Sequence, residues 1–187
     1  MARIWNVNKS LYRSVFFVLM LAMSACGQNS LYEPMDASMQ AFTDESRDLS
    51  LGWLASVSQS GDAQVASMAD SLQLILQDRL IAKVPSIYAQ ECTSTNPGSF
   101  VSAFVLSQDL NSNIYICPDI ERKGEKFMAQ VLIHEAIHLA GVNDECTTTE
   151  LEIAVMQAAG LNPHSNSYVS RCGLSNVATF DHSFDSH

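Results

Sequence analysis

The sequence predicts a mostly helical α+β domain, in which a small antiparallel strand pair lies next to one buried helix. Three observations predict this class. Apolar residues recur at helical spacing in the first half of the chain. Two β-rich runs lie near its middle, and the segment that follows them is apolar almost all round. The 187 residues suffice for one domain with its own core.

The first 25 residues have the pattern of a signal peptide and are not expected to belong to the domain. A basic start precedes the apolar stretch 14–22, which is too short for a membrane span of about 20 residues. The run Met-Ser-Ala-Cys-Gly at 23–27 resembles the lipobox of bacterial lipoproteins, although that family prefers leucine where Met23 stands. The resemblance implies that Cys26 is acylated, and Gly27 then favours the outer membrane of a Gram-negative host. Simple secretion is the alternative.

The charge of the remaining chain limits its partners. All three charged residues among the first 25 are basic, so 7 of the 10 basic residues remain beside 20 acidic ones, a net charge of −13. Such an acidic protein is a poor candidate for binding nucleic acid or anionic lipid. We therefore expect membrane contact only through the N-terminal lipid, and a monomer.

Four cysteines remain once Cys26 carries lipid. An even number in an exported chain predicts two disulfides, with three possible pairings. We prefer Cys92–Cys117 and Cys146–Cys172, because each bridge would then brace one flank of the segment around His134.

The first half of the domain, 33–90, should be helical and should follow a short tether at 26–32. We expect one or two helices between Glu33 and Ser60, with a weak point near Leu51-Gly52. A turn at 60–62 should start a second helix over 63–83, where apolar residues keep the 3.6-residue period until Pro85 ends it.

The second half, 91–173, should be the catalytic part. The runs 100–106 and 113–117 favour an antiparallel strand pair. The main helix should span 125–140 and stop at Gly141. The S/T-x-x-E pattern from Thr147 to Glu150 should open a further helix that runs through Ala159. The residues 174–187 have the character of a loose tail.

The run His134-Glu135-Ala136-Ile137-His138 carries the chemistry. Two histidines four residues apart on a helix share one face, so both can reach one tetrahedral zinc ion. Glu135 is then the candidate general base for hydrolysis. Because the helix around the motif is apolar, burying these polar groups without a partner would be unfavourable.

The third ligand should be acidic. The stretch from His138 to Asp144 resembles the metzincin-like pattern HExxHxxGxxD, and Gly141 would let the chain reverse so that Asp144 meets the metal. We prefer Asp144; Glu150 in the following helix and Glu145 are the alternatives. Helix capping is the competing role for these carboxylates.

A wider stretch, 100–173, resembles the aspzincins, the group of deuterolysin and the lysine-specific metalloendopeptidases. It includes a strand ending in Cys117-Pro118, the HExxH helix and Asn166-Ser167-Tyr168. The chain lacks that group's Gly-Thr-x-Asp segment and its Tyr-Gly, so lysine specificity does not carry over. The resemblance implies a zincin-like fold.

These patterns predict a zinc metallopeptidase that hydrolyses peptide or protein substrates in the bacterial cell envelope. Tyr168 is a candidate donor to the tetrahedral intermediate, as tyrosines are in several zincins. The alternative function is that of a catalytically silent zinc-binding envelope lipoprotein, which would act as a binding module. Glu135 distinguishes the two functions, because a silent site needs no such carboxylate.

Overall fold

The computed structural model describes residues 33–60, 62–93, 101–106, 112–165 and 167–174. All of them belong to Tyr32–His187, the second of the two units into which the chain divides. The expected signal peptide, the lipid attachment site Cys26 and the tether lie outside the described residues. So does the expected tail, apart from its first residue.

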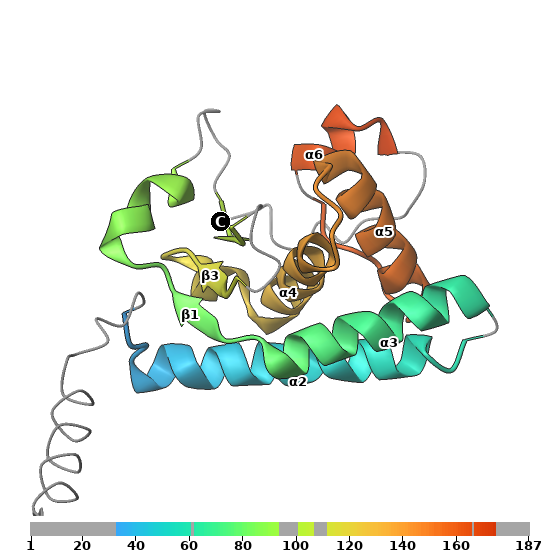
Figure 1. The fold of residues 1–187 in the computed structure, drawn as a ribbon, viewed down its shortest axis with the longest axis horizontal. Coiled ribbons are helices and arrows are strands. Elements are labelled where there is room, and N and C mark those ends of the chain that lie inside the picture. The colour runs from blue at the N-terminus through green and yellow to red at the C-terminus, as the bar shows by residue number, and fades with distance from the viewer. Residues whose placement is uncertain (1–32, 61, 94–100, 107–111, 166, 175–187) are drawn as a thin grey trace, which may run out of the picture. The chain divides into compact units, whose positions relative to one another are not determined.

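Two long helices that lie side by side begin the domain (Figure 1). Helix α2 (Ala37–Val57) is capped by Asp36, which accepts a hydrogen bond from the amide of Met39. Helix α3 (Ala63–Asp78) starts at Asp62, as the turn at 60–62 predicted. Gly52 does not interrupt α2, so the expected weak point there is wrong.

The expected end of the second helix is also wrong. It runs to Asp78 only, and Ile81–Lys83 form strand β1. The backbone decides this difference: the amide of Ile114 donates to the carbonyl of Leu80, and the amide of Val84 donates to that of Ile116. Pairing with another strand therefore overrides the helical spacing of the apolar residues.

The sheet has three strands in the order β1-β3-β2. The expected antiparallel pair is present as β2 (Ala103–Phe104) and β3 (Ile114–Ile116). Strand β1 adds to the other side of β3 in parallel, with Ile81 opposite Ile114. The fold is thus α+β and mostly helical, with a mixed sheet where the sequence predicted two antiparallel strands. Short 3₁₀ helices cover Ser86–Cys92 and Ile120–Lys123.

Helix α4 (Glu125–Leu139) runs through the core and has nine buried residues. Helix α2 packs along it, and the hydroxyl of Ser50 donates a hydrogen bond to the carbonyl of Ala129 at 3.0 Å. The small buried serines of α2, Ser46 and Ser50, allow the two helices to approach closely. Gly141 follows with a positive φ of 99°, which ends the helix as predicted.

Helix α5 (Glu145–Ala158) packs on α4, and the short helix α6 (Ser167–Arg171) packs on α5. The predicted start of α5 at Thr147 is wrong by three residues. Asp144 is the N-cap: it accepts hydrogen bonds from the amide and the hydroxyl of Thr147, both at 2.8 Å. A carboxylate at that position satisfies the free amide of the first turn directly.

Both preferred disulfides are confirmed. Cys92 is bonded to Cys117 at the end of β3, and Cys146 in the first turn of α5 is bonded to Cys172 after α6. Two such bridges are typical of exported proteins. Within the described residues, no helix is both long enough and apolar enough to span a bilayer.

Candidate metal centre

His134 and His138 lie one turn apart on the same face of α4. Their Nε2 atoms are 3.2 Å from each other. Both side chains are half-buried, because the helix around them is packed into the core on its other faces. The two imidazoles therefore present a nitrogen each to one shared point.

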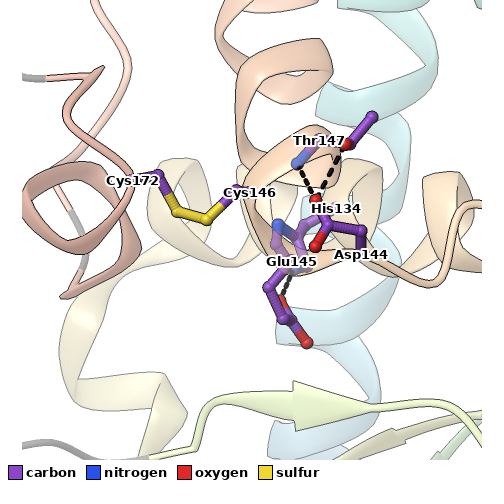
Figure 2. The surroundings of a disulfide bond; sticks show 6 residues. All are labelled: His134, Asp144, Glu145, Cys146, Thr147 and Cys172. Atoms are coloured by element: carbon purple, nitrogen blue, oxygen red, sulfur yellow. Dashed lines mark hydrogen bonds and ion pairs between the residues drawn. A yellow bond between two sulfur atoms is a disulfide. The ribbon is translucent and has the colours of Figure 1, made fainter.

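Glu145, the first residue of α5, completes the group. One carboxylate oxygen lies 3.2 Å from Nε2 of His134, and the other lies 3.5 Å from Nε2 of His138. Figure 2 shows the Glu145 side chain directed at His134. Among the described residues, these three side chains form the group that could hold a metal ion.

The spacing of the three donors fits a tetrahedral ion. With zinc–ligand distances of about 2.0–2.1 Å, two donors at the tetrahedral angle are about 3.3 Å apart. The observed separations of 3.2, 3.2 and 3.5 Å agree with this value. Two imidazoles and one carboxylate also form a common donor set of catalytic zinc sites, which leave one position open.

The structure places the three acidic candidates differently. Asp144, the preferred third ligand, turns toward Thr147 as a helix cap and is exposed (Figure 2). Glu150 is exposed on α5. Glu145, the remaining alternative, is the carboxylate that reaches the histidines. Because α5 starts three residues earlier than expected, Asp144 serves as its cap and Glu145 becomes the first residue of the helix.

A second carboxylate holds the other side of His134. Glu152 on α5 is 1% exposed, and one of its oxygens lies 2.7 Å from Nδ1 of His134. Its other oxygen accepts a hydrogen bond from the side-chain amide of Gln130, which lies one turn before His134 on α4. Such outer carboxylates fix the ring orientation of a metal-ligating histidine and raise its basicity.

His138 is held by the backbone. Its Nδ1 lies 2.7 Å from the carbonyl oxygen of Val142. That carbonyl can only accept, so Nδ1 carries a proton, and the neutral ring then has a bare Nε2 that can form a ligand bond. Val142 reaches this position because Gly141 reverses the chain after α4. The chain reversal predicted at Gly141 is present, and it places the carbonyl of Val142 against His138.

The histidines and carboxylates of the site shift one another's pKa values. Burial disfavours the charged form of His134, but hydrogen bonds to Glu145 and Glu152 outweigh burial and raise its pKa to about 10. Burial likewise lowers the pKa of His138, and the hydrogen bond to Glu145 reverses the shift to a net increase. For Glu145, burial raises the pKa, but the two histidines overcome this effect and lower it to about 2. The carboxylates therefore favour a positive charge at the two histidines.

Glu135, the candidate base, is 6% exposed beside the two histidines. Burial raises the pKa of its carboxyl, although the charges of His134 and His138 act in the opposite direction. A carboxyl whose pKa is raised by burial takes up a proton more readily than an exposed glutamate does. Its side chain is therefore suited to proton transfer.

Tyr168 on α6 also lies at the site. Its ring stacks on His134 with 6.4 Å between ring centroids, and the guanidinium of Arg171 lies 4.9 Å from the Tyr168 centroid. Burial and the charge of Glu145 raise the pKa of the phenol. The Cys146–Cys172 bridge joins the residue after Glu145 to the end of α6 (Figure 2). This disulfide therefore ties together two elements that carry site residues.

Comparison of the chain with protein-family models, with curated proteins and with solved structures finds no match. The chemistry of the protein is therefore inferred from the site itself.

Sequence reasoning missed Glu152 and Gln130, although spacing marks both. Gln130 lies four residues before His134, so it shares the face of the two histidines. Glu152 lies seven residues after Glu145, which places both carboxylates on one face of α5. A search for acidic residues at helical spacing from Glu145 would have found it.

Proposed function

We propose that His134, His138 and Glu145 bind Zn²⁺ and that the protein is a zinc-dependent metallopeptidase of the bacterial cell envelope. The observation that carries the proposal is the arrangement of the three donor atoms. Their separations match the edges of a zinc tetrahedron, and Glu135 of the same HExxH run lies beside them.

The charge of the site supports a dication. Three carboxylates, Glu135, Glu145 and Glu152, surround the two imidazoles, and two of them are almost fully buried. Burying anionic groups without compensating charge is unfavourable. A zinc ion would supply two positive charges where the carboxylates converge, and mixed nitrogen and oxygen donors at this spacing suit zinc.

Each residue of the site then has its own role in peptide hydrolysis. Bound zinc would supply Lewis acidity toward a water molecule and a peptide carbonyl. The carboxylate of Glu135 takes a proton from the attacking water and later gives it to the nitrogen of the leaving amine. Tyr168 donates its hydroxyl hydrogen to the developing oxyanion. Glu152 and Val142 hold the two histidines in place.

The cellular site follows from the two disulfides and from the N-terminal sequence. Disulfides persist in exported compartments. The lipobox-like run at 23–27 adds an anchor through Cys26, so the domain would act on peptides or proteins at the envelope surface.

The experiment combines metal analysis with a cleavage assay. Purified wild type should contain one zinc per chain and cleave a mixed-sequence peptide library. Glu135→Gln should keep the metal and the fold but lose activity by about 10²–10⁴-fold, because the general base is gone. Glu150→Gln removes the same charge from an exposed position and should change neither property.

The result also separates the second candidate function, a silent zinc-binding lipoprotein. Full zinc occupancy with no cleavage by wild type would favour that binding module. Full activity in Glu135→Gln would contradict the peptidase mechanism. Wild type without metal would overturn the zinc site itself.

A further inference from the structure

Gln130 is a buried amide whose orientation is fixed by main-chain atoms. Its side-chain oxygen accepts a hydrogen bond from the amide of His164 at 2.7 Å, and its side-chain nitrogen donates to the carbonyl of His164 at 3.0 Å. A backbone amide can only donate and a backbone carbonyl can only accept. The amide of Gln130 therefore cannot turn over without breaking both bonds.

The fixed orientation of the Gln130 amide determines which hydrogen-bond group Glu152 must present to it. The nitrogen of Gln130 also donates to Glu152, so the oxygen of Glu152 that faces it must be an acceptor. The other oxygen of Glu152 faces Nδ1 of His134. An ionised carboxylate accepts at both oxygens, and it therefore satisfies Gln130 and receives the Nδ1 proton at the same time.

The proton on Nδ1 also determines whether Nε2, on the opposite side of the His134 ring, is free to bind a ligand. With its proton on Nδ1, a neutral His134 has a bare Nε2, and that nitrogen faces Nε2 of His138 and the carboxylate of Glu145. The opposite tautomer would carry hydrogen on Nε2 and could not ligate there.

We propose that Glu152 selects the tautomer of His134 that can bind zinc through Nε2, that the fixed amide of Gln130 makes this selection depend on a carboxylate at position 152, and that the selection sets the metal affinity of the centre. The proposal rests on the zinc site described above. Both are positioning residues, because they touch neither substrate nor metal and act through His134. The amide of Gln130, oriented by the backbone at His164, fixes which hydrogen-bond group the side chain at position 152 must present to it.

Glu152→Gln tests this selection, since the variant keeps the size of the side chain. Gln130 still requires an acceptor, so the new amide should place its oxygen toward Gln130 and its NH₂ toward His134. Nδ1 must then accept, and the proton moves to Nε2. The double variant Gln130→Leu/Glu152→Gln removes that requirement, so the new amide can turn its oxygen to Nδ1.

The experiment measures zinc affinity at one pH by competition with a chromophoric chelator. Glu152→Gln should bind about 10–100-fold more weakly than wild type, as changes in outer partners of zinc ligands typically do. The double variant should recover most of the loss, although it should be less stable than either single variant. Gln130→Leu alone should bind close to wild type, because the carboxylate still accepts from Nδ1. Glu150→Gln is the charge-matched control.

Each outcome bears on one proposal. Wild type without zinc would overturn the zinc site, whereas wild type with zinc and an unweakened Glu152→Gln would overturn only the tautomer selection. A double variant as weak as Glu152→Gln would contradict it too, because loss of charge alone would then explain the effect. If Glu152→Gln does not fold, ¹⁵N spectra of zinc-loaded wild type decide: a proton on Nδ1 of His134 supports the proposal, and metal on Nδ1 refutes it.

Discussion

Asp144 and Glu145 are adjacent in the chain, yet their carboxylates serve different partners. Asp144 accepts hydrogen bonds from Thr147 in the first turn of α5, whereas Glu145 lies against His134 and His138 on α4 (Figure 2). Asp144 thus caps the helix, and Glu145, the next residue, is thereby placed against the two histidines.

This division predicts opposite effects for two matched substitutions. Glu145→Ala should lower zinc affinity by several orders of magnitude, because an anionic ligand is lost. Asp144→Ala should lower the free energy of unfolding by about 1 kcal/mol and leave zinc bound, because only a helix cap is lost. Chelator competition and denaturant unfolding measure the two effects. Zinc loss in Asp144→Ala but not in Glu145→Ala would reverse the assignment.

The metal-free protein should lose stability as the solution becomes alkaline. The pKa of folded His134, about 10, lies above its ordinary value of 6.5. A pKa that is higher in the folded than in the unfolded protein adds to the free energy of unfolding. This contribution is complete below pH 6.5 and is lost as the pH rises through about 10. Thermal unfolding after chelator treatment, recorded from pH 6 to 10.5, should show a falling midpoint. Glu152→Gln, which removes one partner of His134, should flatten this trend.

Zinc binding should show the opposite dependence. Zinc must displace a proton from His134, so affinity should increase with pH up to about 10. An unperturbed histidine would give a plateau above about pH 7. Competition titrations at several pH values distinguish the two cases, and a plateau at pH 7 would show that the carboxylates do not hold the proton as described.

The two disulfides should differ in their effect on the metal. They span 25 and 26 residues, so removing either should destabilise the fold by a similar amount, about 3–4 kcal/mol in the loop-entropy model. Only Cys146–Cys172 adjoins Glu145, so Cys146→Ser/Cys172→Ser should weaken zinc binding more than Cys92→Ser/Cys117→Ser. Equal zinc affinities in the two double variants would contradict this prediction.

The N-terminal anchor can be tested separately from the site. Wild type expressed in a bacterial host should fractionate with membranes and carry acyl chains on Cys26, since two or more chains hold a protein stably on a bilayer. Cys26→Ser should be released in soluble form with the zinc site intact. Recovery of unmodified wild type in the soluble fraction would favour simple secretion.

Features that depend on local chemistry could be predicted from the order of the residues alone. The four-residue spacing of His134 and His138 places them on one helix face whatever surrounds them. Gly141 predicted the end of α4, because its positive φ suits a helix end. The α+β class followed from the apolar periods, and the preferred cysteine pairing agrees with the structure.

Tertiary structure decided which carboxylate meets which histidine. The sequence favoured Asp144 over Glu150 and Glu145 as the third ligand, although each of these carboxylates could equally cap a helix. The choice depends on where α5 begins and on how it packs against α4, and both are set by contacts distant in the sequence. The same reason explains strand β1 and the Gln130–Glu152–His134 contacts: their partners lie 18–34 residues apart along the chain, beyond the reach of any local pattern.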